Sequence, residues 1–296
     1  MQIVYHLGAH CTDDERLVRC LLKNRGALAQ HGVVVPGPAR YRNLLRDTAI
    51  ALKGAPANHD TQALVLDQIM DEDRAERLIL SWDNFMSFPP WALKGMLYPS
   101  AAERVHAFSN IFPEIQAEFF LAIRNPASFL PALFEKQKAD KARVKPYDGF
   151  VAGTDIFQLR WSDTVQSVLD ANPGVPLTIW CDEDTPLIWP EVLQAITMHG
   201  PDVMLEGTED LLTQIMSSEG LTRMRAYLGK HPANTQQMRR RVVSAFLDKF
   251  ALPDKIEVKV ELPGWTADTV ARLTETYERD VATLQQMEGV RFLGTN

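Results

Sequence analysis

Short apolar runs alternate with amphipathic segments through the first two thirds of the chain, and this alternation limits the fold more than any other feature. The runs cover residues 3–7, 33–35, 78–80, 119–123 and 177–180. They are nearly continuous in apolar residues, as strands buried on both faces of a parallel sheet are. Helical spacing predicts helices from residue 13 to Gly32 and over 41–54, 61–73, 100–112, 127–141 and 155–171. This repetition predicts βαβ units, and therefore an α/β fold with a doubly wound parallel sheet.

The last third of the chain is expected to be mostly helical. Residues 209–230 and 234–251 fit two helices separated by Pro232, and a final helix has an apolar stripe that ends at Leu284. Residues 256–262 alternate between apolar and charged, which predicts a strand with one solvated face or an extended connector. With no internal repeat or low-complexity tract, we expect one domain over 1–296 with a helical C-terminal part from about residue 200.

Composition excludes several classes of protein. Of the 296 residues, 46% are apolar and 23% are charged, so the chain can bury a full core. A net charge of −7 argues against a nucleic-acid partner, which requires a basic face. No apolar run is long enough for a membrane span, and no basic segment precedes the first run, so we expect a cytoplasmic protein. The three cysteines and the scattered histidines lack the spacing of metal ligands, so no metal is predicted.

The loop after the first run is a candidate anion site. A strand, a loop and a helix start follow each other here, and free backbone N–H groups converge at such a start. The loop residues are Gly8, Ala9, His10, Cys11 and Thr12. Thr12 or Asp13 suits the helix N-cap, with Asp14 and Glu15 in the first turn. These acids would repel a phosphate, and the loop is no Walker A motif, so an ordinary capped helix is the alternative.

Two further strand ends have residues suited to anion binding or proton transfer. Arg124 follows the run 119–123, where a guanidinium can bind a phosphate in a bidentate way, and Ser128 lies one helical turn further. A surface ion pair is the alternative for Arg124. Asp83 follows the run 78–80 and is a candidate general base, with a turn or N-cap role as its alternative. His10 is a second candidate for proton transfer, because histidine titrates near neutrality.

In order and spacing these segments resemble the sulfotransferase family, whose members use 3′-phosphoadenosine-5′-phosphosulfate (PAPS) as donor. Many bacterial members begin with a strand and loop that read H-x-G-x-x-K-T-G-T-T-S-L. The family's second block is an apolar strand that ends in Arg-(Asn/Asp)-Pro. The family also has a Ser-x-Glu segment on an intervening strand, whose acid can serve as base, a later strand with an acidic end, and a closing helix. The residues in register with these features and with the two blocks are His6, Gly8, His10, Thr12, Leu17, 121–126, 81–85, 178–184, Tyr277 and Asp280.

The resemblance implies a P-loop NTPase-like three-layer fold and a sulfuryl transfer from PAPS to a hydroxyl of a carbohydrate or small molecule. Asp83 or His10 would then accept the proton of that hydroxyl. The implied donor-binding residues are Gly8, Ala9, His10, Cys11, Thr12, Arg16, Arg124 and Ser128.

This sequence departs from the family pattern at the 5′ end of the donor. The family's loop lysine falls at Cys11, its Gly-Thr at Asp13-Asp14, and its 3′-phosphate serine at Ala132. Ser128 and Arg16 are the candidate substitutes for the serine and the lysine, respectively. The family's late Arg-Lys-Gly element has a counterpart in the run 239–241. These departures leave two alternatives open: a non-catalytic binding or scaffold protein of the same fold, and a transferase that uses another phosphate-bearing donor.

Overall fold

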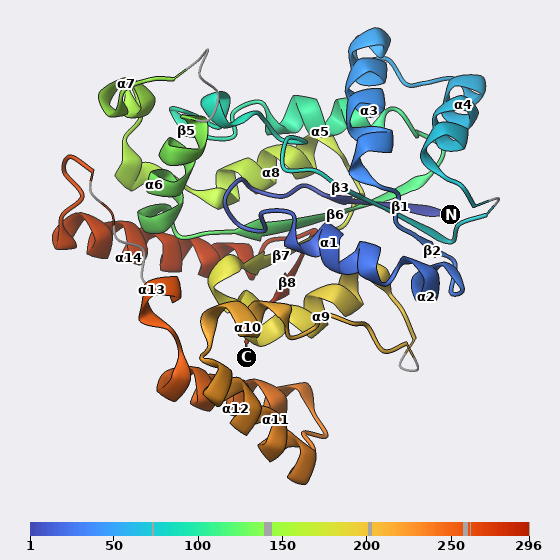
Figure 1. Cartoon of the computed structure of the whole chain (residues 1–296). Coiled ribbons are helices and arrows are strands. Elements are labelled where there is room, and N and C mark those ends of the chain that lie inside the picture. The colour runs from blue at the N-terminus through green and yellow to red at the C-terminus, as the bar shows by residue number, and fades with distance from the viewer. Residues whose placement is uncertain (73, 139–143, 201–202, 257–259, 261, 296) are drawn as a thin grey trace.

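The computed structural model describes residues 1–72, 74–138, 144–200, 203–256, 260 and 262–295. At its centre is a parallel six-stranded sheet with the strand order β2-β3-β1-β6-β7-β8 (Figure 1). The strands are β1 (Gln2–His6), β2 (Val33–Val34), β3 (Arg77–Ser81), β6 (Gln116–Ile123), β7 (Leu177–Cys181) and β8 (Val290–Leu293). The five predicted runs are thus confirmed as strands. A short antiparallel pair, β4 (Leu93–Lys94) and β5 (Met96–Leu97), lies outside this sheet.

Helices cover both faces of the sheet, because alternate strand residues enter two different cores. In β1, Tyr5 packs into one core and Val4 into the other. The first face packs against α3 (Pro38–Leu52), α4 (His59–Ile69), α5 (Ala101–Ser109), α6 (Pro126–Gln137), α8 (Trp161–Ala171) and α14 (Ala267–Leu284). The second face packs against α1 (Arg16–Lys23), α2 (Arg25–Ala29) and α9 (Thr185–Thr197). The predicted α/β architecture with a parallel sheet is therefore confirmed.

Several predicted helix boundaries were wrong. The first helix begins at Arg16, because Asp14 and Glu15 have positive φ angles of 45° and 64°, which a right-handed helix does not accept. The helix expected over 209–230 is two helices, α10 (Asp210–Ile215) and α11 (Ser218–Lys230), since Met216 pairs with Ala251 in an isolated bridge.

Other differences lie at elements that the sequence pattern did not single out. The pattern did not predict α9, which contains Pro190, or β8, which has only four residues. Ile256 lies in the short helix α13 (Pro253–Ile256), and most of the strand expected over 256–262 lies outside the described residues.

The C-terminal helical unit, formed by α10, α11 and α12 (Gln236–Phe250), has a small core of its own. Leu212, Met216 and Met224 are buried within it. Leu187 of α9 packs against both this core and the core on the second face of the sheet, which attaches the unit to the sheet. Within the described ranges, we find no helix with the length and apolarity that crossing a bilayer requires.

Arg77 ties together the amino ends of three neighbouring strands. Its side chain is only 5% exposed and forms an ion pair with Glu118 of β6. The same guanidinium donates to the side chain of Gln2 in β1 and to the carbonyl of Ile196 in α9. A buried charge with all of these partners fixes the strand register at the rim opposite the loops described below.

We expect Arg77→Met to lower the free energy of unfolding by about 3 kcal/mol, because Glu118 would remain nearly buried without its cation. Urea denaturation measures this change. The double variant Arg77→Met/Glu118→Leu is the matched control and should recover part of the loss, since it removes both charges. A single variant within about 1 kcal/mol of the wild type would contradict this role.

Candidate functional site

The carboxyl ends of β1 and β6 form the position where ligands bind in open α/β sheets. These strands are neighbours, yet the chain leaves β1 toward β2 on one side and leaves β6 toward β7 on the other. The two connections therefore diverge and leave a crevice at this rim. Residues 7–15, here called the β1 loop, and the segment from Arg124 to Pro126 border this crevice.

A cleft of about 860 Å³ opens at this rim, which is within the usual range for small-molecule sites. One side is formed by the β1 loop, the start of α6 and the turn after β7, and the other by the C-terminal helical unit, α13 and α14. The polar lining includes Cys11, Thr12, Asp14, Arg16, Arg124, Asn125, Ser128, Asp182, Glu183, Ser244, Asp248, Lys255, Thr266 and Thr274. The apolar lining includes Leu187, Leu211, Ile215, Leu247, Ile256, Val260, Trp265 and Val270.

Arg124 is held in a fixed position at the base of this cleft, which is called the main cleft from here on. Its Nε–H donates to Ser128 Oγ over 2.9 Å, and its Nη1 donates to the carbonyl oxygen of Cys11 in the β1 loop. The backbone carbonyl of Arg124 accepts the indole N–H of Trp161 over 2.9 Å. Nη2 has no hydrogen-bond partner in the part of the chain that the structure describes. The guanidinium is thus pre-oriented with donors left for a ligand.

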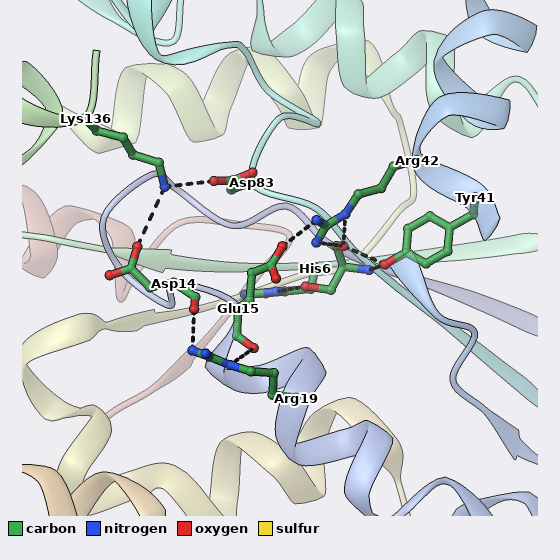
Figure 2. Close-up of polar contacts among 9 residues, drawn as sticks. His6, Asp14, Glu15, Arg19, Tyr41, Arg42, Asp83 and Lys136 are labelled. Carbon is green, nitrogen blue, oxygen red and sulfur yellow. Dashed lines mark hydrogen bonds and ion pairs between the residues drawn. The ribbon is translucent and has the colours of Figure 1, made fainter. Parts of the chain in front are cut away.

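Basic side chains from α6 and α3 neutralise acids in and beside the β1 loop (Figure 2). Lys136 reaches over from α6, with its Nζ 2.9 Å from Asp83 Oδ2 and 3.7 Å from Asp14 Oδ1. Glu15 forms an ion pair with Arg42 of α3, whose guanidinium also donates to the carbonyl of Ser81. These contacts explain how a run of acids is tolerated here, and they place Asp83 in an ion pair.

The N-terminus of α1 is capped from within the loop. Asp13 Oδ1 accepts the backbone N–H of Leu17 over 2.8 Å, and the Asp13 carbonyl accepts that of Arg16. A carboxylate therefore already occupies a position that favours an anion. At Gly8, φ is +55° and a Cβ would lie 3.2 Å from the Asp83 Cα, so both conformation and space require glycine.

His10 lies in the protein interior and not at the cleft. Its backbone N–H donates to Tyr98 Oη over 2.8 Å, and its Nδ1 lies 2.9 Å from the same oxygen. Its Nε2 lies 3.1 Å from the side-chain amide of Asn84. Burial lowers the pKa of His10, so the ring is neutral at physiological pH. Both ring nitrogens are used, and the residue anchors the β1 loop to Tyr98.

Apart from the buried His10, the predicted site residues divide into two groups. Cys11, Thr12, Arg16, Arg124 and Ser128 line the main cleft. Gly8, Ala9 and Asp83 lie around a small void behind the β1 loop, together with Lys136.

Sequence reasoning gave Asp182 and Glu183 no role in the site, although they directly follow a predicted strand and lie in the segment 178–184. It also missed the wall from the C-terminal helical unit, because no local pattern indicates which helix covers a distant loop.

Glu183 and Asp182 bring acid groups into the cleft. Glu183 accepts the backbone N–H of Asn125 over 2.8 Å and the hydroxyl of Tyr277 over 3.1 Å. Burial raises the pKa of Asp182 to about 7, although the nearby guanidinium groups of Arg124 and Arg16 act in the opposite direction. Burial also raises the pKa of the Cys11 thiol to about 11, so this cysteine is not a reactive thiolate.

The charges on the cleft wall are nearly balanced. Arg16, Arg124 and Lys255 face the acids Asp14, Asp182, Glu183 and Asp248. No group of His, Cys, Asp or Glu side chains suited to a metal ion occurs among the described residues.

Comparison with known proteins adds nothing to this geometry. No family model matches the chain, and no curated protein or solved structure shows significant similarity to it.

We expect the stability of the protein to decrease near neutral pH through Asp182. The pKa of Asp182 in the folded protein, about 7, lies above the ordinary value of about 3.9. The protonated carboxyl therefore contributes fully to the free energy of unfolding below about pH 3.9, and this contribution is lost as the pH rises through about 7. Asp182→Asn should therefore raise the melting temperature more at pH 8 than at pH 5, by roughly 2 °C. Asp248→Asn, on the opposite wall, is the control, and an equal gain from both variants at pH 8 would refute the assignment.

Proposed function

We propose that this chain is a sulfotransferase-like protein with a P-loop NTPase-like fold that binds a small amphiphilic ligand with one anionic group. The observation that carries the proposal is the Arg124 guanidinium, fixed by Ser128 and Cys11 and with Nη2 left for a ligand. A single anion on Arg124 is neutralised, while the apolar wall of the C-terminal helical unit accepts the rest of the ligand. In this proposal the protein is a binding module without sulfuryl transfer.

The charge of the cleft favours one anionic group over PAPS. PAPS carries about four negative charges, and at an effective dielectric of about 20 each contact with a carboxylate near 4 Å costs about 4 kcal/mol. The wall of the cleft holds more acids than bases, and Asp13 already caps α1. The family's loop lysine is replaced by Cys11, whose thiol is neutral. A donor with several phosphates would therefore meet more repulsion than Arg16, Arg124 and Lys255 offset.

A second candidate is sulfuryl transfer from PAPS to a hydroxyl of a carbohydrate or small molecule. The contact between Arg124 and Ser128 beside the β1 loop favours it, because this pair suits a phosphate of the donor. Lys136 would supply the cation that Cys11 lacks, after release from Asp83. Asp83 would then be free to accept the proton of the acceptor hydroxyl, with His10 orienting the loop through Tyr98.

Calorimetry with two probes separates these functions. We expect octyl sulfate, below its micelle concentration, to bind with a dissociation constant below 1 mM, and we expect adenosine 3′,5′-bisphosphate to give no heat at millimolar concentration. Arg124→Ala should raise the dissociation constant of octyl sulfate at least tenfold, because a charge-assisted hydrogen bond is lost. Arg19→Ala, which removes an exposed cation of α1 outside the cleft, is the matched control and should bind like the wild type.

The other possible results also distinguish the binding module from the PAPS-dependent transferase. Micromolar binding of the bisphosphate that Arg124→Ala removes would favour the PAPS-dependent transferase, and transfer of labelled sulfate from PAPS would establish it. If neither probe binds, or if Arg124→Ala and Arg19→Ala behave alike, the proposed ligand class is wrong.

A further inference from the structure

We infer a second binding site, separate from the main cleft, for a small hydroxylated compound with one anionic group, such as a sugar phosphate or sugar acid. It is a cavity of about 770 Å³ between α9, α12 and β8, called here the β8 cavity. The helices α9 and α12 lie on the same side of the sheet (Figure 1). The β8 cavity and the main cleft have no lining residue in common among the described residues.

A nearly buried ion pair forms part of the wall of this cavity. Arg240 Nε lies 2.9 Å from Glu191 Oε1, and the two side chains are only 15% and 8% exposed. Such a pair loses hydration on both charges, so a pair of apolar residues would serve stability equally well. Glu191 Oε2 has no hydrogen-bond partner in the described ranges. A buried carboxylate oxygen without a donor indicates a missing partner, and a ligand hydroxyl supplies one.

The cavity also has an excess of positive charge. Arg291 of β8 lines it and has no ion-pair partner among the residues described, while Glu191 is the acid that balances Arg240. One arginine thus remains for an anionic group, and a guanidinium binds phosphate or carboxylate in a bidentate way.

The rest of the lining suits hydroxyl groups. Gln236 of α12 and Gln285, just after α14, add side-chain amides, each of which can both donate and accept hydrogen bonds. Phe292 and Ile188 provide an apolar surface for the carbon skeleton of the ligand. A few polar groups around an apolar surface are typical of small-molecule sites of this volume.

This site also accounts for a motif that the main cleft leaves unexplained. The run 239–241 was the counterpart of the family's late basic element, yet it lies on α12 and Arg240 lines the β8 cavity. Arg239 has a buried Nη1 without a hydrogen-bond partner in the described part of the chain. Arg239 is not part of the cavity lining, so Arg240 is the residue that connects this run to the β8 cavity.

The test is titration calorimetry on the full chain with glucose 6-phosphate, gluconate, glucose and inorganic phosphate. We expect glucose 6-phosphate or gluconate to bind with a submillimolar dissociation constant, and glucose and inorganic phosphate to bind at least tenfold more weakly. Arg291→Ala should weaken the tight ligand about tenfold, and Gln236→Ala should weaken it less. Arg46→Ala, which removes an exposed cation of α3 on the other face of the sheet, is the matched control and should have no effect.

Arg124→Ala distinguishes this site from the main cleft, because it should leave the binding of the sugar ligand unchanged while it weakens the binding of octyl sulfate. If Arg291→Ala does not fold, Arg291→Gln keeps the first part of the side chain with a neutral polar end and tests the same charge. No binding of any probe at 10 mM, or equal loss in Arg291→Ala and Arg46→Ala, would overturn the proposal. Inorganic phosphate binding as tightly as glucose 6-phosphate would overturn the assignment of a hydroxylated ligand.

Discussion

The contact between the Arg124 guanidinium and the Cys11 carbonyl joins two segments that are 113 residues apart in the chain. It forms because β1 and β6 are adjacent and parallel, so their carboxyl ends must meet at the same rim of the sheet. Ser128, one helical turn into α6, fixes the remaining freedom of the guanidinium. The main cleft depends on this contact, since its base is formed by the residues that Arg124 holds together.

The β1 loop has a geometry that would suit a bound anion, but acidic side chains of the protein itself occupy the position. Each of its three consecutive acids has a different partner: Asp13 caps α1, Asp14 lies near Lys136, and Glu15 pairs with Arg42. Because these partners come from α1, α6 and α3, the loop conformation is set by the surrounding helices. The loop is therefore a structural unit that borders the cleft, and the charge available to a ligand lies mainly on Arg124.

Five of the six strands were predictable from the sequence, because continuous apolar runs with breaks at Gly8 and near Arg124 have few alternatives to buried parallel strands. The edge strand β8 was not, since its four residues form no such run. The meeting of the loop and Arg124 follows from the same rule about strand ends. The start of α1 was not predictable, since the left-handed conformation of Asp14 and Glu15 accompanies contacts with distant helices. The burial of His10 likewise depends on Tyr98, which is 88 residues away.

The position of Asp182 beside Arg124 and Arg16 has a thermodynamic consequence for any anion that enters the main cleft. An added negative charge favours the neutral form of this carboxylic acid, so association of the anion draws a proton from the solvent near neutrality. Occupancy and protonation are then two linked equilibria, and the heat of association varies with the ionisation enthalpy of the buffer. The affinity of such an anion would therefore fall as the pH rises through about 7.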